Sequence, residues 1–166
     1  MHRLPAAIRI ALFSLAFTLS CFARLGETVE QSVDRYGVPV QTIKVCDNCE
    51  LLVFRKSGFE VTACFYKGTC TSLSVSALTG ESFKSAPSEA ECDAILLENS
   101  EASKWGKSQK VGDDKIWKRE DGGFAVRKFM DSLTMVSPDN VKFSEEEKAA
   151  EAAASKAKAQ NTTSGL

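Results

Sequence analysis

Histidine is almost absent from this sequence. His2 is the only histidine in 166 residues, and it lies in a segment that we expect to be removed. A chain without imidazole has no Ser-His-Asp or Cys-His catalytic site, no histidine zinc site and no histidine ligand for haem. These classes of enzyme and cofactor protein are therefore excluded for the mature chain.

An excess of positive charge is also missing. The chain has 21 Lys and Arg residues against 22 Asp and Glu residues. Loss of Arg3 and Arg9 with the amino-terminal segment leaves 19 against 22, a net charge of −3. Because nucleic-acid-binding proteins present a basic field to the phosphates, we expect no nucleic-acid partner.

Long apolar runs are lacking as well. The run at Ile10–Leu19 has about ten residues, whereas a membrane-spanning helix needs about 20, so we expect no transmembrane segment. A basic start with Arg3 and Arg9, this apolar run and a small-x-small ending at Cys21-Phe22-Ala23 are typical of a signal peptide. We predict that residues 1–23 are cleaved and that the protein is exported, to the periplasm or the extracellular medium.

An alternative is a lipoprotein acylated at Cys21. The stretch Thr18-Leu19-Ser20-Cys21 partly matches a lipid-attachment site. The first position of the match is wrong for such a site, which disfavours a lipid anchor.

The remaining chain is long enough for one hydrophobic core. We predict a single α+β domain over residues 24–142, which divides into halves at 24–80 and 86–138. Residues 143–166 shift in composition to Ala, Glu and Lys without an apolar stripe, so we expect a solvated helix or a disordered tail.

The element pattern predicts an antiparallel β-meander with two short helices packed on it. Thr28 and Gln31 form a capping box for a helix over residues 28–36, and Ser88 and Glu91 form another for a helix that ends near Asn99. Runs of alternating apolar residues, separated by turn residues, predict strands at 40–45, 51–56, 59–65, 69–77, 116–119, 124–129 and 133–136.

The order of these elements suggests two helix-and-meander repeats. Phe54, Gly58-Phe59-x-Val61 and Phe65 in the first half are echoed by Trp117, Gly123-Phe124-x-Val126 and Phe129 in the second. The gaps differ, and meanders of aromatic strands resemble one another in general, so both interpretations stay open.

Five cysteines remain after signal removal, and export to an oxidising compartment favours disulfides. The apolar sets of strands 59–65 and 69–77 share a face if Phe59 pairs with Val75. This register leaves a three-residue loop at 66–68 and sets Cys64 opposite Cys70. We therefore predict a Cys64–Cys70 disulfide.

Cys46-Asp47-Asn48-Cys49 has the spacing of a redox dithiol, but a strand follows it instead of the helix that stabilises a thiolate. We favour a structural disulfide across a two-residue turn. Pairing of Cys46 or Cys49 with Cys92 stays open, and Cys92 also fits a buried free thiol. Zinc bound by Cys46, Cys49, Cys64 and Cys70 is a further alternative, although the second pair is widely spaced and export favours oxidation.

No other residues converge on a catalytic site. Asp113, Asp114, Glu120 and Asp121 cluster near a predicted hairpin, where carboxylates are usually solvated turn residues. Trp105 and Trp117 are expected to anchor the core or its rim. The serines of strand 69–77 are expected to face solvent (Ser72, Ser74 and Ser76).

Gly26-x-Thr28-x-x-Gln31 followed by Gly37-x-Pro39 resembles the opening helix of the SmpA/OmlA (BamE-like) family of small outer-membrane assembly proteins. That family is similar in architecture to β-lactamase-inhibitor proteins. Ser32 stands where the motif usually has an apolar residue. The resemblance implies a protein-binding or envelope-associated scaffold.

We therefore predict an exported, non-enzymatic protein-interaction module without catalytic residues, cofactor or metal. The alternative is a thiol-redox or zinc-binding protein that uses Cys46 and Cys49. The sequence does not identify the protein partner or the oligomeric state.

Overall fold

A computed structural model of the chain describes residues 24–80, 83–100, 103–140, 142–143 and 145. The predicted signal peptide and nearly all of the predicted tail lie outside these residues. The elements, in chain order, are α2 (Val29–Tyr36), β1 (Gln41–Cys46), β2 (Cys49–Lys56), β3 (Phe59–Tyr66), β4 (Thr69–Thr79), β5 (Phe83–Ser85), α3 (Glu89–Glu98), β6 (Gln109–Val111), β7 (Asp114–Lys118), β8 (Phe124–Arg127) and β9 (Leu133–Val136).

The strands form one antiparallel sheet in the order β1-β2-β3-β4-β9-β8-β7-β6, and β5 pairs with the end of β4. Each half contributes a helix and four strands, and the halves meet where β4 pairs with β9. The predicted α+β class, an antiparallel meander with short helices, is confirmed. The prediction missed β5 and β6, which are three residues each.

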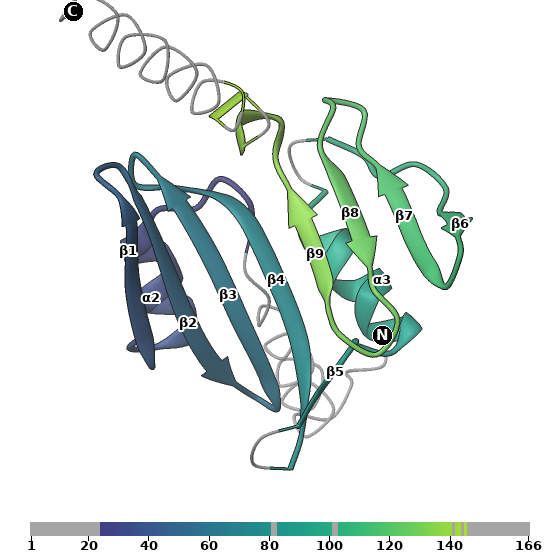
Figure 1. The fold of residues 1–166 in the computed structure, drawn as a ribbon, viewed down its shortest axis with the longest axis horizontal. Helices are drawn as coiled ribbons and strands as arrows, with labels where there is room; N and C mark the ends of the chain where they lie inside the picture. The colour runs from purple at the N-terminus through teal and green to yellow at the C-terminus, as the bar shows by residue number, and fades with distance from the viewer. Residues whose placement is uncertain (1–23, 81–82, 101–102, 141, 144, 146–166) are drawn as a thin grey trace, which may run out of the picture.

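Both helices pack on the same face of the sheet. In Figure 1 they lie behind the strands, α2 behind β1 and β2 and α3 behind the second half. Each helix begins with the predicted capping box, formed by Thr28 and Gln31 in α2 and by Ser88 and Glu91 in α3. The boxes satisfy amide groups that a helix start leaves without partners, so the short helices have defined starts.

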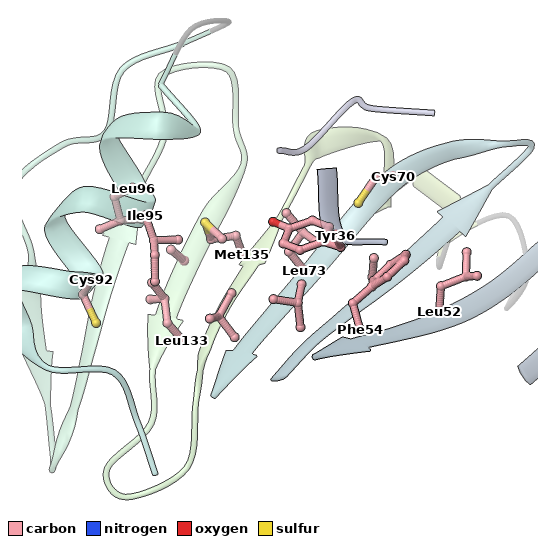
Figure 2. Close-up of a cluster of buried hydrophobic side chains, with 14 of the residues drawn as sticks. Tyr36, Leu52, Phe54, Cys70, Leu73, Cys92, Ile95, Leu96, Leu133 and Met135 are labelled. Carbon is pink, nitrogen blue, oxygen red and sulfur yellow. The ribbon is translucent and has the colours of Figure 1, made fainter. Parts of the chain in front are cut away.

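The core lies between the helices and this face of the sheet (Figure 2). The Tyr36 ring of α2 stacks on Phe54 of β2 with centroids 5.2 Å apart. Ile95 of α3 is fully buried, as are Leu133 and Met135 of β9. Because side chains alternate along a strand, the residues between these core positions point to the other face.

Residues that match between the two halves in sequence do not lie on the same face of the sheet. Val61 is a core residue of β3, whereas the core residue of β8 is Ala125, so Val126 lies on the other face. The order of elements is repeated, but the echoed residues are shifted by one position relative to the pleat. A one-residue shift moves every side chain to the opposite face.

The predicted register of β3 and β4 is wrong by two residues. Phe59 pairs with Ala77, and the turn is the two-residue Lys67-Gly68 with φ of 51° and 78°. Positive φ at both positions gives a turn whose twist suits a hairpin. A shift of two residues keeps all apolar side chains on the same face, so the hydrophobic pattern fits both registers and only the turn separates them.

The predicted Cys64–Cys70 disulfide is also wrong, because both cysteines are free thiols. Cys64 pairs with Ser72, and Cys70 pairs with Phe65 beyond a register shift that leaves Thr71 as an extra residue on β4. This bulge turns Cys70 into the core, where it is 1% exposed. Cys64 lies between the core residues of β3 and therefore points to the opposite face.

Candidate functional site

The face of the sheet opposite the helices is the main candidate site, and we call it the uncovered face. Figure 1 views the sheet from this side. The register places two rows of side chains across it. The first row is Ile43, Leu51, Cys64, Ser72, Val136, Phe124 and Lys118, and the second is Gln41, Val53, Thr62, Ser74, Thr134, Val126, Ile116 and Gln109.

Hydroxyl side chains form the centre of the uncovered face. Ser74 of β4 and Thr134 of β9 are joined by a hydrogen bond of 3.2 Å between their hydroxyl oxygens, across the junction of the two halves. The predicted serines do lie on this face, but Ser72 and Ser74 are half-buried and Ser76 is only 8% exposed. Because the central side chains are short, the larger side chains of the flanking strands protrude further from the face.

Aliphatic and aromatic side chains occupy both flanks. Ile43 is 41% exposed on one flank and Phe124 is 36% exposed on the other. Val53 and Val126 are half-buried at matching places in the two halves. An exposed apolar patch that neither described helix covers is typical of an interaction surface.

One end of the uncovered face carries an aromatic contact. The ring of Phe143, which follows β9, lies 4.3 Å from the Tyr66 ring between centroids. The Lys67 ammonium lies 4.9 Å from the centroid of the same Tyr66 ring, within the range of a cation–π contact. Phe143 is thus a residue beyond β9 that packs on the uncovered face.

The opposite end carries a cluster of three charges. Glu60 of β3 is 7% exposed and accepts a hydrogen bond of 3.0 Å from Arg55 Nε of β2. Lys84 of β5 forms an ion pair with the other carboxylate oxygen of Glu60. Burial acts to raise the pKa of Glu60, but the hydrogen bonds from Lys84 and Arg55 outweigh it and lower the pKa. The sequence did not single out Glu60, because an acidic residue in a strand usually faces solvent.

We expect Glu60 to make folding stability depend on pH. A carboxyl group with a lowered pKa in the folded state stabilises the protein above its ordinary value of 4.5, and the contribution is lost as pH falls through the lowered pKa. Glu60→Gln should therefore lower the free energy of unfolding by about 1–2 kcal/mol at pH 7 and by less at pH 3. Urea unfolding at both pH values measures this, and an equal loss at both would contradict it.

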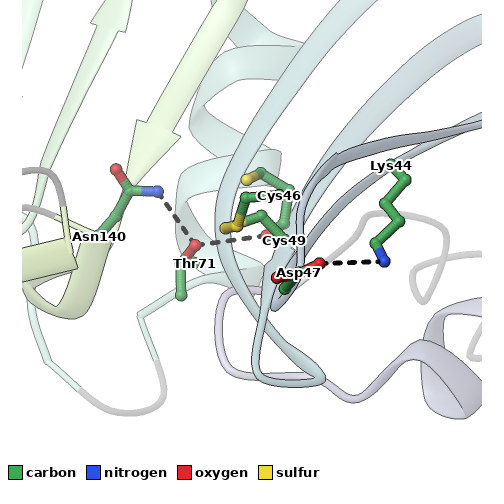
Figure 3. Close-up of a disulfide and its surroundings, with 7 residues drawn as sticks. Lys44, Cys46, Asp47, Cys49, Thr71 and Asn140 are labelled. Carbon is green, nitrogen blue, oxygen red and sulfur yellow. Dashed lines mark hydrogen bonds and ion pairs between the residues drawn. A yellow bond between two sulfur atoms is a disulfide. The ribbon is translucent and has the colours of Figure 1, made fainter. Parts of the chain in front are cut away.

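The second candidate site is the disulfide between Cys46 and Cys49 (Figure 3). It joins β1 to β2 across the two-residue turn Asp47-Asn48, with the Cα atoms 4.8 Å apart, as in the structural interpretation of this pair. Chain entropy over so small a loop gives a stabilisation of about 2 kcal/mol, less than that of a longer loop. Cys49 pairs with Tyr66, so the disulfide lies on the uncovered face.

A shallow hollow of about 320 Å³ opens beside this disulfide, and both cysteines line it. Cys46 is half-buried, whereas Cys49 is only 3% exposed. Lys44 and Lys67 line the same hollow. The Lys44 ammonium lies 3.4 Å from Asp47 Oδ1, in an ion pair exposed to solvent.

The three free thiols among the described residues, Cys64, Cys70 and Cys92, are poor nucleophiles. Burial raises the pKa of Cys70 far above its ordinary value, and it raises the pKa of Cys92 to about 11. Burial also raises the pKa of Cys64, against a hydrogen bond with Thr71 that acts in the opposite direction. Since the thiolate is the reactive form, these cysteines are not activated.

The zinc alternative is not supported by this arrangement. Two of its four cysteines form a disulfide, and Cys64 and Cys70 point to opposite faces of β3 and β4. In the described part of the chain, no three histidine, cysteine or acidic side chains come together as a metal site requires. The described helices include none with both the length and the apolar character needed to cross a bilayer.

The acidic residues near the β7–β8 hairpin do not face one another across a pocket. Asp121 accepts two hydrogen bonds from Arg119, of 2.8 Å from Nε and 2.6 Å from Nη2. The hydrogen bonds from Arg119 lower the pKa of Asp121. Asp114 accepts a hydrogen bond of 3.1 Å from the Phe129 amide. Both carboxylates therefore hold turns together.

Trp117 and Trp105 belong to the core and its rim, as expected. Trp117 is 9% exposed within the core cluster, and Trp105 packs against that cluster. Neither indole is presented as an exposed platform for a ligand.

Comparison of the sequence with protein families and with curated proteins gives no match in either case. Among solved structures, a cysteine-rich secretory protein from Staphylococcus aureus matches with 13% identity and a TM-score of 0.40, over 70% of this chain and 46% of that chain. An extracellular protein containing an SCP domain from Bacillus anthracis matches with 11% identity and a TM-score of 0.41, over 70% and 45%. This chain thus spans less than half the length of either protein.

Proposed function

We propose that this protein is an exported, non-enzymatic interaction module that binds a protein partner through the uncovered face of its sheet. The observation that carries the proposal is the pair of side-chain rows that crosses the sheet opposite the helices. Their apolar flanks, with Ile43 on one side and Phe124 on the other, are exposed and lie on the side of the sheet opposite the described helices.

The composition of the face specifies the partner surface that fits it. Two apolar groups of the partner would lie over the flanks, and hydrogen-bonding groups would lie over the central hydroxyls of Ser74 and Thr134. In protein interfaces, buried apolar anchors supply most of the binding free energy, and hydrogen-bonding groups fix the orientation. Export is supported by the signal-peptide pattern at residues 1–23. The resemblance of residues 26–39 to an outer-membrane assembly family points to an envelope-associated partner.

Photo-crosslinking in cells that produce the protein tests the proposal. A photoreactive amino acid is placed at Phe124 on the uncovered face, at Ile43 on its other flank, and at Leu97 of α3 as the control. Leu97 is 73% exposed but lies on the helix side. We expect a discrete protein adduct from Phe124 and Ile43 and none from Leu97. The mass of the purified protein should show loss of residues 1–23.

Affinity for the captured partner then separates specific binding from general stickiness. Phe124→Ala should weaken binding at least about tenfold, as truncation of an interface anchor does. Leu97→Ala should leave the affinity unchanged. Equal crosslinking from both sides of the sheet, or no adduct from the uncovered face, would overturn the proposed binding role, and an intact leader would overturn export.

A further inference from the structure

The hairpin that carries the disulfide differs from the two hairpins beside it in the sheet. Ser57-Gly58 and Lys67-Gly68 have positive φ at both turn positions, which suits the twist of paired strands. Asp47-Asn48 has positive φ at neither position, and the pairing of β1 with β2 shifts register between Lys44 and Cys46. The turn itself is therefore poorly matched to the hairpin, and the disulfide holds its ends together.

The two sulfur atoms differ in access. Cys46 belongs to edge strand β1, is half-buried and lines the open hollow, whereas Cys49 is buried in β2. Attack on a disulfide proceeds at the sulfur that an incoming thiolate can reach. Because Cys46 Sγ is the more accessible sulfur, it is the atom that is attacked, and Cys49 is the leaving thiolate.

The hollow has no net charge, because two lysines and two carboxylates line it. Lys44 and Lys67 lie on its wall, and their ammonium groups attract a thiolate and stabilise the one that leaves. Two carboxylates, Asp47 and Glu50, line the same hollow and reduce this attraction. An activated thiol of this protein is not required, because the partner supplies the nucleophile.

We propose that the Cys46–Cys49 disulfide is a thiol–disulfide exchange site that reacts with accessible thiols of a partner molecule. The partner thiolate attacks Cys46 Sγ, the Cys46–Cys49 bond breaks, and a mixed disulfide forms between the partner and Cys46. Cys49 leaves as a thiolate and takes up a proton from water. Attack by a second partner thiolate on the mixed disulfide yields a partner disulfide and the Cys46 thiolate, so the pair gains the two electrons that the partner thiols lose.

Exchange also changes the edge of the sheet. All residues of β1 before Cys46 are exposed, so this strand is held by its pairing with β2 and by the disulfide, with little core packing. Opening of the disulfide leaves the unsuited Asp47-Asn48 turn to close the hairpin alone. We expect the amides of β1 to lose protection against hydrogen exchange, while those of β3 keep it.

Variants that lack one cysteine of the pair test the assignment of roles. The oxidised wild-type protein and its Cys49→Ser and Cys46→Ser variants are incubated with glutathione disulfide or with reduced glutathione, acid-quenched, alkylated and mapped by peptide mass. Reduced glutathione should open the wild-type pair. Glutathione disulfide should modify Cys46 in Cys49→Ser at least about tenfold faster than Cys49 in Cys46→Ser, because Cys49 is buried.

Two further measurements identify the class of partner and test the electrostatic contribution of the lysines. Reduced, unfolded ribonuclease A replaces glutathione, so faster opening by the protein thiols indicates a protein partner and faster opening by glutathione indicates a small thiol. The double variant Lys44→Gln with Lys67→Gln should slow opening by roughly threefold at low salt, whereas Lys107→Gln, at an exposed lysine outside the hollow, should not.

The proposal fails if the wild-type disulfide stays closed at thiol concentrations that open an exposed reference disulfide. It also fails if Cys46 and Cys49 are modified at equal rates in the two variants. Hydrogen exchange of β3 in each variant verifies that the sheet is folded, so a misfolded variant is recognised and the wild-type result decides. The binding proposed above does not require exchange, because Phe124 and Ile43 lie outside the hollow.

Discussion

Replacement of Phe54 by alanine is expected to lower the free energy of unfolding by about 4 kcal/mol. Phe54 has no exposed surface and stacks on Tyr36, so its ring joins β2 to α2. Removal of the ring loses its burial and leaves a cavity that the surrounding strands only partly fill. Because a domain of this size is stable by about 5–15 kcal/mol, the loss is a large share of the total.

Urea unfolding followed by circular dichroism measures this loss from the shift in midpoint at constant slope. Phe129→Ala is the matched control, since Phe129 is 62% exposed and its truncation should change stability by less than about 0.5 kcal/mol. Similar losses from both variants would contradict the position of Phe54 at the centre of the core.

Replacement of Arg119 by alanine should cost about 3 kcal/mol, the second-largest effect that we expect. The Arg119 side chain is 5% exposed and forms an ion pair with Asp121. It also donates a hydrogen bond of 3.4 Å from Nη1 to the Asn99 carbonyl at the end of α3. Its guanidinium lies 5.3 Å from the Trp105 ring centroid. One side chain thus connects a helix end, a loop and the β7–β8 hairpin.

Two variants separate the causes of this effect. Arg119→Lys keeps the positive charge but cannot donate two parallel hydrogen bonds to Asp121, so we expect an intermediate loss. Lys118→Ala removes an exposed neighbouring charge and should have little effect. If Arg119→Ala and Lys118→Ala unfold at the same urea concentration, the connecting role of Arg119 is wrong.

Local patterns predicted the helices well. The capping boxes at Thr28 and Ser88 fixed the starts of α2 and α3, because each box uses only residues within one helical turn. The meander was predicted for the same reason, since alternation and turn residues are properties of short segments. The three-residue strands β5 and β6 were missed because they are too short to show alternation.

The candidate sites depended on more than local patterns. The sequence pointed to the Cys46–Cys49 pair, since a two-residue turn brings its flanking residues together by itself. It did not place Glu60 with Arg55 and Lys84, because Lys84 comes from a strand that the pattern did not reveal. It also gave no sign of the rows on the uncovered face, which require the pairing of β4 with β9.

Interactions between near neighbours in the chain explain what could be predicted from the sequence: the α+β class, the two capped helices and the apolar faces of β3 and β4. The register of β3 and β4, and with it the pairing of Cys64 with Ser72 and of Cys70 with Phe65, depends on the folded sheet. Registers that differ by two residues bury the same apolar side chains. The Lys67-Gly68 turn and the bulge at Thr71 distinguish them, and both depend on how the strands twist together in the folded sheet.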